Sequence, residues 1–459
     1  MILLNQRKTV HFIGIGGVGM SGLAEFLYAA GYAVSGSDRL SSAITKRLES
    51  LGIKIQYDHS PLLVRAAHLV VYSSAIRDDN AEREYARDNK IPVMRRAEML
   101  GELMRMKFSI AVAGTHGKTT TTSLVGQILS DAGWTPTVIV GGILRRYDTN
   151  AIAGKGDILV AEADEFDRSF LKMYPSIAVV TNIEEDHLDC YSGIEDITAA
   201  LLQFANLVPF YGALVACADE PHVRELLAGY AKPAVTYGVS QEADYTARDI
   251  SFTGGKTVFS VYKKAQKQGS IELTIPGLHN VKNALAACAV ATEIGVDFAT
   301  IARSLLGFGG IKRRFEIIGQ KAGVTVIDDY AHHPSEIAAT LSAARSAGYR
   351  RVVAVFQPHL YTRTRDFLDG FAQALCAADE FAVTAIYKSR EEPIAGVNSL
   401  AIVEKAEKLG HKHACYIENK ADIAGVLAPL LRSGDAVVVM GAGDINEICR
   451  DLLAEIPDA

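Results

Sequence analysis

Short apolar runs alternate with helix-length stretches along the whole chain, and the pattern restarts twice. Apolar runs lie at residues 9–15, 32–35 and 68–72; the second segment begins with the run at 109–113, and the third with the run at 324–327. Strands separated by helix-length segments pair in parallel, because the helices cross over on the faces of the sheet. The sequence therefore predicts an α/β fold built three times.

One stretch departs from this pattern. Residues 244–276 contain short alternating runs around the Gly-rich turn at 253–256, which is typical of a β-hairpin. We therefore expect an antiparallel addition to an otherwise mainly parallel sheet.

The composition excludes several classes of protein. The chain is 49% hydrophobic and 22% charged, as in soluble globular proteins, and it shows no signal peptide or transmembrane run. Its six cysteines form no C-x-x-C pair, so neither a zinc site nor a disulfide framework is indicated. A formal net charge of −6 argues against a nucleic-acid partner. We expect a cytoplasmic protein, monomeric or homodimeric, that binds neither nucleic acid nor membrane.

The first chemical motif is Gly14-x-Gly16-x-x-Gly19, between a predicted strand and a predicted helix, with Asp38 at the end of the next strand. Glycines let a diphosphate approach the backbone N–H groups at a helix N-terminus. The alternative is tight packing of strand against helix with no ligand. The motif does not distinguish a nicotinamide dinucleotide from a UDP-sugar, because both present a pyrophosphate and a ribose.

The second motif is the run Gly114-Thr115-His116-Gly117-Lys118-Thr119-Thr120, which follows a buried strand and opens a helix. It offers backbone N–H groups and a lysine for phosphates, and a hydroxyl for Mg²⁺. Val112 stands where the first glycine of a standard phosphate loop would lie. The run predicts ATP binding, with the lysine exposed in the empty site; the alternative is a glycine loop with a surface lysine.

Carboxylates at strand ends provide a third signal. Glu162 ends the apolar run at 158–161, where it can reach a metal ion at the phosphate loop, and a polar cluster at 181–189 follows the run at 177–180. The alternatives are helix caps for Asp186 and Asp189 and a buried, hydrogen-bonded His187.

These motifs together resemble the ATP-dependent Mur ligases of peptidoglycan synthesis. The resemblance rests on residues 114–122, 162–171, 186–189, 277–284, 313–316 and 328–334, in order along all three segments. It is strongest to the members that join L-alanine to UDP-N-acetylmuramate, which share the motifs at 14–20 and 356–359.

The resemblance implies three domains. They are a Rossmann-like UDP-sugar domain at 1–106, a central P-loop-type ATPase domain with a mainly parallel sheet at 107–311, and a Rossmann-like domain at 312–459 that contributes to ATP and amino-acid binding. It also implies a reaction in which the lactyl carboxylate of the sugar attacks the γ-phosphorus of ATP. The amine of L-alanine then displaces phosphate from the resulting acyl phosphate.

The family's site residues carry over to matching positions. The implied catalytic residues are Lys118, His187 and Arg314, and the implied Mg²⁺ ligands are Thr119, Glu162 and His187. The implied ATP contacts are Gly114, Thr115, His116, Gly117, Lys118, Thr119, Thr120, Asn280, Asn283, Arg314 and Asp329. The UDP-sugar contacts would be Gly14, Gly16, Gly17, Gly19, Met20, Ser37, Asp38, Ser73 and Ser74. The amino-acid contacts would be Tyr330, His359 and Arg363.

Two differences refine the assignment. Relatives that add later amino acids carry a carbamoylated lysine soon after the Asp-His motif, whereas this chain has no lysine between Asp189 and Lys232. Alanine-adding members often have arginine after the position of His359, but here it is Leu360, so we assign the amino-acid carboxylate to Arg363. The alternative for Arg363 is a solvated surface arginine.

Three other functions compete with alanine ligation. They are a recycling ligase that attaches a murein peptide to UDP-N-acetylmuramate, a nicotinamide-dependent oxidoreductase with a regulatory ATP module, and a nucleotide-switched binding protein. The oxidoreductase lacks a hydride-site histidine and acid near the first glycine motif, and the switch leaves Arg314 and Asp329 without roles.

Overall fold

The computed structural model describes residues 8–73, 75–186, 190–253, 255–389 and 391–458. The chain divides into two compact units. The first contains Met1–Arg248, Val261–Gly269 and Lys282–Leu305, and the second contains Asp249–Ser260, Ser270–Val281 and Leu306–Ala459. None of the helices in the described part of the chain combines the length and apolar character that crossing a bilayer requires.

The first sheet has five parallel strands in the order β3-β2-β1-β4-β5. Its strands are β1 (Thr9–Ile13), β2 (Ala33–Ser37), β3 (Lys54–Gln56), β4 (Leu69–Tyr72) and β5 (Val93–Arg95). The helices around it are α1 (Val18–Ala29), α2 (Ala43–Ser50), η1 (Val64–Ala66), α3 (Ala81–Asp88) and α4 (Arg96–Arg105). This order is typical of a Rossmann-like half-sheet, in which the chain adds strands first on one side of β1 and then on the other.

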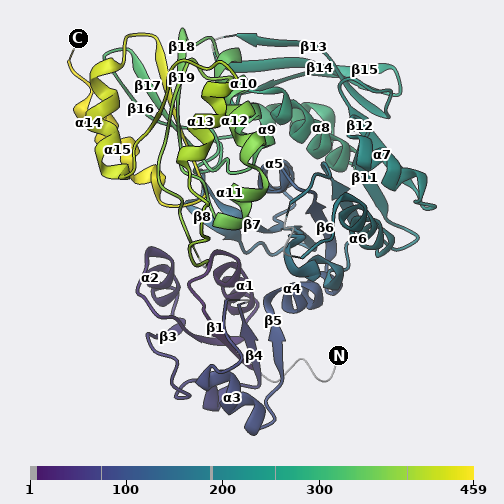
Figure 1. The fold of residues 1–459 in the computed structure, drawn as a ribbon. Helices are drawn as coiled ribbons and strands as arrows, with labels where there is room; N and C mark the ends of the chain where they lie inside the picture. Colours follow the sequence, from purple (N-terminus) through teal and green to yellow (C-terminus); the bar gives the residue numbers. More distant parts are fainter. Residues whose placement is uncertain (1–7, 74, 187–189, 254, 390, 459) are drawn as a thin grey trace. The chain divides into compact units, whose positions relative to one another are not determined.

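Side chains of β1 alternate between the two faces of this sheet. Val10 and Phe12 join a core that contains Leu23 of α1 and Leu100 of α4. Ile13, on the opposite face, packs in a cluster with Ala86 of α3, and Figure 1 shows α3 on the side away from α1 and α4. His11 is two residues before Ile13, so its side chain lies on the same face of the sheet and points toward α3.

The second sheet has ten strands in the order β15-β14-β13-β12-β11-β10-β6-β9-β7-β8. These are β6 (Phe108–Ala113), β7 (Thr137–Leu144), β8 (Thr149–Ile152), β9 (Ile158–Glu162), β10 (Ile177–Val180), β11 (Ala213–Cys217), β12 (Ala234–Gly238), β13 (Tyr245–Thr253), β14 (Lys256–Lys263) and β15 (Gln266–Leu273). The helices are α5 (Lys118–Asp131), η2 (Phe166–Lys172), α6 (Ile194–Asn206), α7 (Pro221–Ala228), α8 (Leu278–Glu293) and α9 (Phe298–Leu306). Its centre is parallel, because β6 pairs in parallel with β9 and β10. The predicted strand pair at the Gly-rich turn is present as the neighbours β13 and β14.

The third sheet has six strands in the order β16-β17-β21-β18-β19-β20, and only its edge strand β16 is antiparallel. Its strands are β16 (Glu316–Lys321), β17 (Val324–Asp329), β18 (Arg351–Phe356), β19 (Glu380–Val383), β20 (Ala414–Tyr416) and β21 (Asp435–Met440). The helices are α10 (Pro334–Ser346), α11 (Tyr361–Asp366), α12 (Leu368–Leu375), α13 (Leu400–Lys408), η3 (Lys420–Asp422), α14 (Ile423–Leu427), η4 (Ala428–Leu430), η5 (Ile445–Glu447) and α15 (Ile448–Glu455). Val352 and Val353 of β18 enter separate cores on the two faces.

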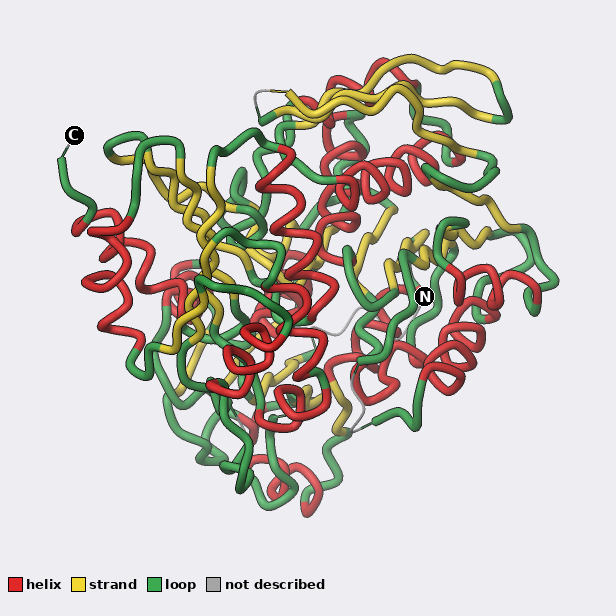
Figure 2. Tube along the Cα trace, turned by 45° about the horizontal axis from the view of Figure 1, so that its top comes forward, coloured by secondary structure: helices red, strands yellow, loops and turns green. Residues whose placement is uncertain are grey.

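Both sheet faces of the third sheet are therefore buried, which explains why its strands read as continuous apolar runs instead of alternating ones. Helices and strands follow each other along the trace in Figure 2. The predicted α/β fold with mainly parallel sheets is confirmed.

Candidate active site

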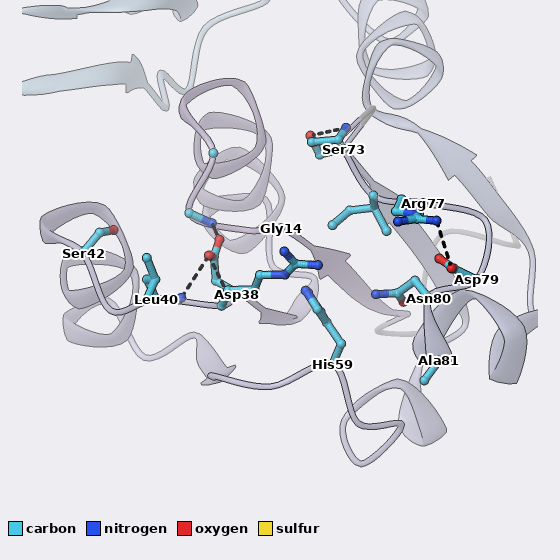
Figure 3. Close-up of a pocket in the computed structure, with 15 residues that line it drawn as sticks. Gly14, Asp38, Leu40, Ser42, His59, Ser73, Arg77, Asp79, Asn80 and Ala81 are labelled. Atoms are coloured by element: carbon cyan, nitrogen blue, oxygen red, sulfur yellow. Dashed lines mark hydrogen bonds and ion pairs between the residues drawn. The ribbon is translucent and has the colours of Figure 1, made fainter. Parts of the chain in front are cut away.

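The carboxyl ends of β1, β2 and β4 surround a pocket of about 700 Å³ in the first sheet. Gly14, Gly16 and Gly17 follow β1, Asp38 follows β2, and Ser73 follows β4, and all five line this pocket (Figure 3). The strand order reverses between β1 and β4, and such a switch point is where open α/β sheets bind ligands.

Asp38 shapes the glycine loop. Its Oδ2 accepts a hydrogen bond from Gly16 N at 2.8 Å, and its Oδ1 accepts one from Arg39 N at 2.7 Å. A Cβ atom at residue 16 would lie 2.8 Å from the same Oδ2 atom, so only glycine allows this contact. Asp38, which the sequence associated with the glycine motif, thus holds the loop by accepting a hydrogen bond from the backbone N–H of Gly16.

Other residues predicted to contact the UDP-sugar lie elsewhere in the same domain. Met20 lies in α1 and is buried in the core, and Gly19 allows α1 to pack against Arg96 of α4. Ser37 is fully buried, and its hydroxyl donates to Glu82. Ser74 and His187, which the sequence assigned to the sugar site and the metal site, lie outside the described residues.

The phosphate loop connects β6 to α5 and requires glycine at two positions. Gly114 has φ +121° and Gly117 has φ +81°, values that strain other residues. A Cβ at residue 114 would lie 2.3 Å from Thr181 Oγ1, and one at residue 117 would lie 2.4 Å from Asn283 Oδ1.

The loop after β10 holds the phosphate loop in place. Thr115 N donates to Asn182 O at 3.2 Å, and His116 N donates to Asn182 Oδ1 at 2.8 Å. His116 O accepts from Thr181 Oγ1 at 2.6 Å and from Asn182 Nδ2 at 3.1 Å. These bonds fix the backbone before any ligand arrives, which reduces the entropy that ligand binding must remove.

Lys118 is paired with a buried carboxylate. Its Nζ donates to Glu165 Oε1 and Oε2 at 2.9 and 2.8 Å and to Gly114 O at 2.7 Å. The side chain of Lys118 is 16% exposed and that of Glu165 is 4% exposed, so the expected exposed lysine is wrong. Burial alone would lower the pKa of Lys118, but Glu165 together with Asp164 and Glu162 raises that pKa above its ordinary value.

Oxygen donors lie beside this loop. Thr119 is in the first turn of α5, and Glu162 ends β9, where its Oε1 accepts from Gly141 N at 2.7 Å. The charge of Glu162 acts on Lys118. A hydroxyl and a carboxylate are the ligand types that Mg²⁺ prefers, so the residues present fit a magnesium ion.

Asn280 and Asn283 both lie near the start of α8, but they have different partners. Asn280 Nδ2 donates to Pro276 O at 2.7 Å, a local contact with the backbone that precedes the helix. Asn283 Oδ1 accepts from Thr121 Oγ1 at 3.3 Å and sits against Gly117. Asn283 therefore lies at the phosphate loop.

In the second unit, two arginines flank one tyrosine. The guanidinium carbons of Arg313 and Arg314 lie 5.0 and 5.3 Å from the ring centre of Tyr330, within the range of cation–π attraction. Arg313 also donates to Gly441 O and Gly443 O, and Arg314 lies 3.6 Å from Glu336 Oε1.

Asp329 accepts hydrogen bonds from the backbone next to this cluster. Its Oδ2 accepts from Phe315 N at 2.7 Å, and its Oδ1 accepts from Ala331 N at 2.8 Å. Burial raises the pKa of Asp329 in spite of Arg314 and these two donors. The bonds hold the Arg-Arg-Phe turn against the end of β17, and the predicted contact of Asp329 with ATP stays a prediction.

The residues predicted to bind the amino acid follow β17 and β18. His359 stacks on Tyr387 at 5.8 Å and 16°, and His332 lies between Tyr330 and His359 at 5.3 and 6.2 Å. Arg363 is in α11 and only 9% exposed, so it is not a solvated surface arginine.

Comparison with known proteins identifies the family. Residues 9–108 match the description "Mur ligase family, catalytic domain", residues 112–291 match "Mur ligase middle domain", and residues 313–443 match "Mur ligase, glutamate ligase domain". The chain belongs to the Mur ligase family.

Two relatives from this Mur ligase family are similar over nearly their full lengths. A protein from Sorangium cellulosum is 50% identical over 452 residues, covering 98% of this chain and 96% of the relative. One from Geotalea daltonii is 48% identical over 457 residues, covering 100% of both. Both are named UDP-N-acetylmuramate--L-alanine ligase.

Solved structures of Mur ligases share the fold. The UDP-N-acetylmuramate-alanine ligase of Thermotoga maritima has a TM-score of 0.82 and 32% identity, covering 97% of this chain and 98% of its own. A murein peptide ligase of Psychrobacter arcticus has a TM-score of 0.71 and 28% identity, covering 98% of both chains. The predicted three-domain Mur ligase architecture is confirmed.

Sequence reasoning missed Glu165, Thr181, Asn182 and Arg313 in this Mur ligase. Glu165 lies in the motif at 162–171 and Arg313 in the motif at 313–316, and only one other member of each motif was assigned a role. Thr181 and Asn182 directly follow β10 and belong to the polar cluster at 181–189, so their position just after a strand was the available signal.

Proposed function

We propose that this chain is an ATP-dependent ligase that joins L-alanine to the lactyl carboxylate of UDP-N-acetylmuramate in peptidoglycan precursor synthesis. The observation that carries this function is its 45–50% identity, over nearly the full chain, to eight relatives named for this reaction. A strand-switch pocket for a nucleotide and a phosphate loop paired with acidic residues support it. We further propose that the enzyme works in the cytoplasm as a monomer or homodimer.

In the proposed reaction, a carboxylate oxygen of the sugar bonds to the γ-phosphorus while the bond to ADP breaks. The alanine nitrogen then bonds to the acyl carbon, loses a proton, and phosphate leaves with the former carboxylate oxygen. Lys118 neutralises charge on the oxygens of the γ-phosphoryl group while that group is transferred, and Arg314 is assigned the same role.

Mg²⁺ is the proposed cofactor. Thr119 and Glu162 would hold one ion, His187 would help to hold a second, and the ions would supply positive charge to the phosphate oxygens. Glu165 keeps the Nζ of Lys118 at the loop while the site is empty.

The test is ADP release with UDP-N-acetylmuramate and L-alanine added singly and together. We expect full turnover only with both substrates and Mg²⁺, and loss of turnover with EDTA. Strong ATP hydrolysis without the sugar, oxidation of NADH, or a preference for a tripeptide over L-alanine would contradict this function.

A further inference from the structure

A fully buried carboxylate lies beneath the nucleotide pocket of the first sheet. Glu82, in α3, and His11, in β1, both have side chains with 0% exposure, and His11 Nε2 lies 2.8 Å from Glu82 Oε1. His59, whose side chain is 17% exposed, places its Nδ1 atom 2.9 Å from Glu82 Oε2. One carboxylate thus connects a buried histidine to a histidine at the surface of the domain.

Every acceptor position of Glu82 is used. Oε1 also accepts from Gln56 Nε2 at 3.3 Å, and Oε2 also accepts from Ser37 Oγ at 2.5 Å. A carboxylate offers about four acceptor sites, and four donors occupy them here, three from strands β1, β2 and β3 and one from the loop after β3. Such a satisfied, buried network has one stable arrangement, because moving any donor leaves a buried polar group without a partner.

This arrangement selects the tautomers of both histidines. His11 donates from Nε2 to Glu82, and its Nδ1 lies 2.9 Å from Ser35 Oγ, which donates its hydroxyl proton to that nitrogen when the ring is neutral. His59 donates from Nδ1 to Glu82. The second nitrogen of His59, Nε2, is then an acceptor in the neutral ring.

His59 faces the nucleotide pocket. It lines the pocket together with Gly14, Asp38 and Asn80, and Figure 3 shows its ring directed into the space between Asp38 and Asn80. Among the residues that the structure describes, none forms a hydrogen bond with Nε2 of His59. Phosphate oxygens are acceptors only, whereas a uridine carries donors, namely the ribose hydroxyls and the base N–H.

We propose that Glu82 is a positioning residue, which holds His59 with Nε2 toward the uridine part of a nucleotide bound in this pocket. His59 is the contacting group, and Glu82 acts through it; His11, Ser37 and Gln56 fix Glu82. The inference rests on the proposed function only in taking a uridine nucleotide as the ligand.

Direct binding tests this inference without any ligation step. Uridine, UMP and UDP are titrated into wild type, Glu82→Gln, His59→Ala and the double variant by calorimetry. We expect each single variant to weaken all three ligands by the same factor of about 10, the size of one lost hydrogen bond. The double variant should be no weaker than His59→Ala, because Glu82 acts through that ring.

Matched controls separate positioning from general damage. Glu84→Gln changes an exposed acid on the same helix, and His68→Ala removes an exposed histidine of the same domain; both should bind UDP as wild type does. In the ligase assay, Glu82→Gln should raise the KM for the UDP-sugar and leave kcat and the KM for ATP unchanged.

If Glu82→Gln fails to fold, imidazole ¹⁵N spectra of the wild type decide the point, with the His59 signals identified by their loss in His59→Ala. We expect the Nδ1–H tautomer and a shift of Nε2 when uridine binds. An Nε2–H tautomer, a loss confined to UDP, additive effects in the double variant, or no binding of UDP by wild type would overturn the inference. Binding effects as expected without any ADP release would instead contradict the proposed function alone.

Discussion

Lys118 shows that one residue can serve both the empty and the working site. In the empty loop it neutralises Glu165, whose side chain is 4% exposed. In the proposed reaction, the same ammonium group also faces the phosphate oxygens of ATP. Its removal therefore affects stability as well as turnover.

We expect Lys118→Ala to lower kcat by at least about a thousandfold, as loss of a group that neutralises transition-state charge does. It should also lower the free energy of unfolding by about 3 kcal/mol, because the buried carboxylate of Glu165 loses the cation paired with it. Steady-state kinetics and urea unfolding measure the two effects.

The second variant Lys118→Ala/Glu165→Gln should recover part of the stability and none of the turnover. Lys172→Ala, which changes an exposed lysine of the same domain, should match wild type in both measurements. An unchanged unfolding curve for Lys118→Ala would show that the pair with Glu165 contributes nothing to stability.

Arg363 carries the proposed contact with the amino-acid carboxylate. Arg363→Lys keeps the charge but loses the two-pronged geometry, so the KM for L-alanine should rise about tenfold. The KM values for ATP and UDP-N-acetylmuramate should hardly change.

Arg365→Lys is the matched control, because Arg365 lies in the same helix with its side chain 54% exposed. Varying each substrate in turn measures the three KM values. An equal rise in all three for Arg363→Lys would mean that the arginine supports the fold of α11 and not the amino acid.

At the scale of elements, the sequence was sufficient where a strand is buried on both faces. The run at 177–180 coincides with β10, and the run at 324–327 lies within β17. Continuous apolar runs of this length are typical of strands that helices cover on both faces. The glycine positions of the phosphate loop were also predicted, since the local backbone requires them.

The contacts between loops could not be predicted in this way. Asn182 forms a hydrogen bond with His116, which lies 66 residues away in the sequence. His59 forms one with Glu82, which lies 23 residues away. Periodicity describes neighbours along one element, whereas these pairs depend on which strands adjoin in the sheet. Glu165 was missed for the same reason, because its partner is set by the packing of β9 beside β6.

The loop after β10 should therefore control ATP binding. Asn182→Ala removes the side chain that accepts from His116 N and donates to His116 O, so the phosphate loop becomes less ordered. We expect the KM for ATP to rise about tenfold, the size of one to two hydrogen bonds, with a small loss of stability.

Asn206→Ala, at an exposed residue that ends α6, provides the control and should leave the KM for ATP unchanged. If Asn182→Ala binds ATP as wild type does, the phosphate loop keeps its shape without this connection.

At the scale of the whole molecule, one buried acid should shape the dependence of stability on pH. Burial raises the pKa of Asp328 to about 6, with Asp329 and Glu316 adding to the shift and Arg313 opposing it. The folded protein then binds this proton more tightly than the unfolded chain, where the pKa is 3.8. Between these two values, the contribution of Asp328 to stability falls as pH rises.

Asp328→Asn removes this titration. We expect the difference in unfolding free energy between variant and wild type to shift in favour of the variant as pH rises from 4 to 6, and to stay level above about pH 7. Urea unfolding at several pH values measures it. Asp369→Asn, at a side chain that is 76% exposed, should show no such trend, and a flat difference for Asp328→Asn would mean that its carboxyl titrates normally.

The division of the chain into units has a practical consequence for dissecting the gene. The boundaries fall after Arg248, Ser260, Gly269, Val281 and Leu305, so the second unit is assembled from three separate pieces of sequence. A fragment that begins at Leu306 lacks two of those pieces, and one that ends at Leu305 carries them without the rest. No single truncation therefore isolates either unit from the other, so each is best studied in the full-length protein.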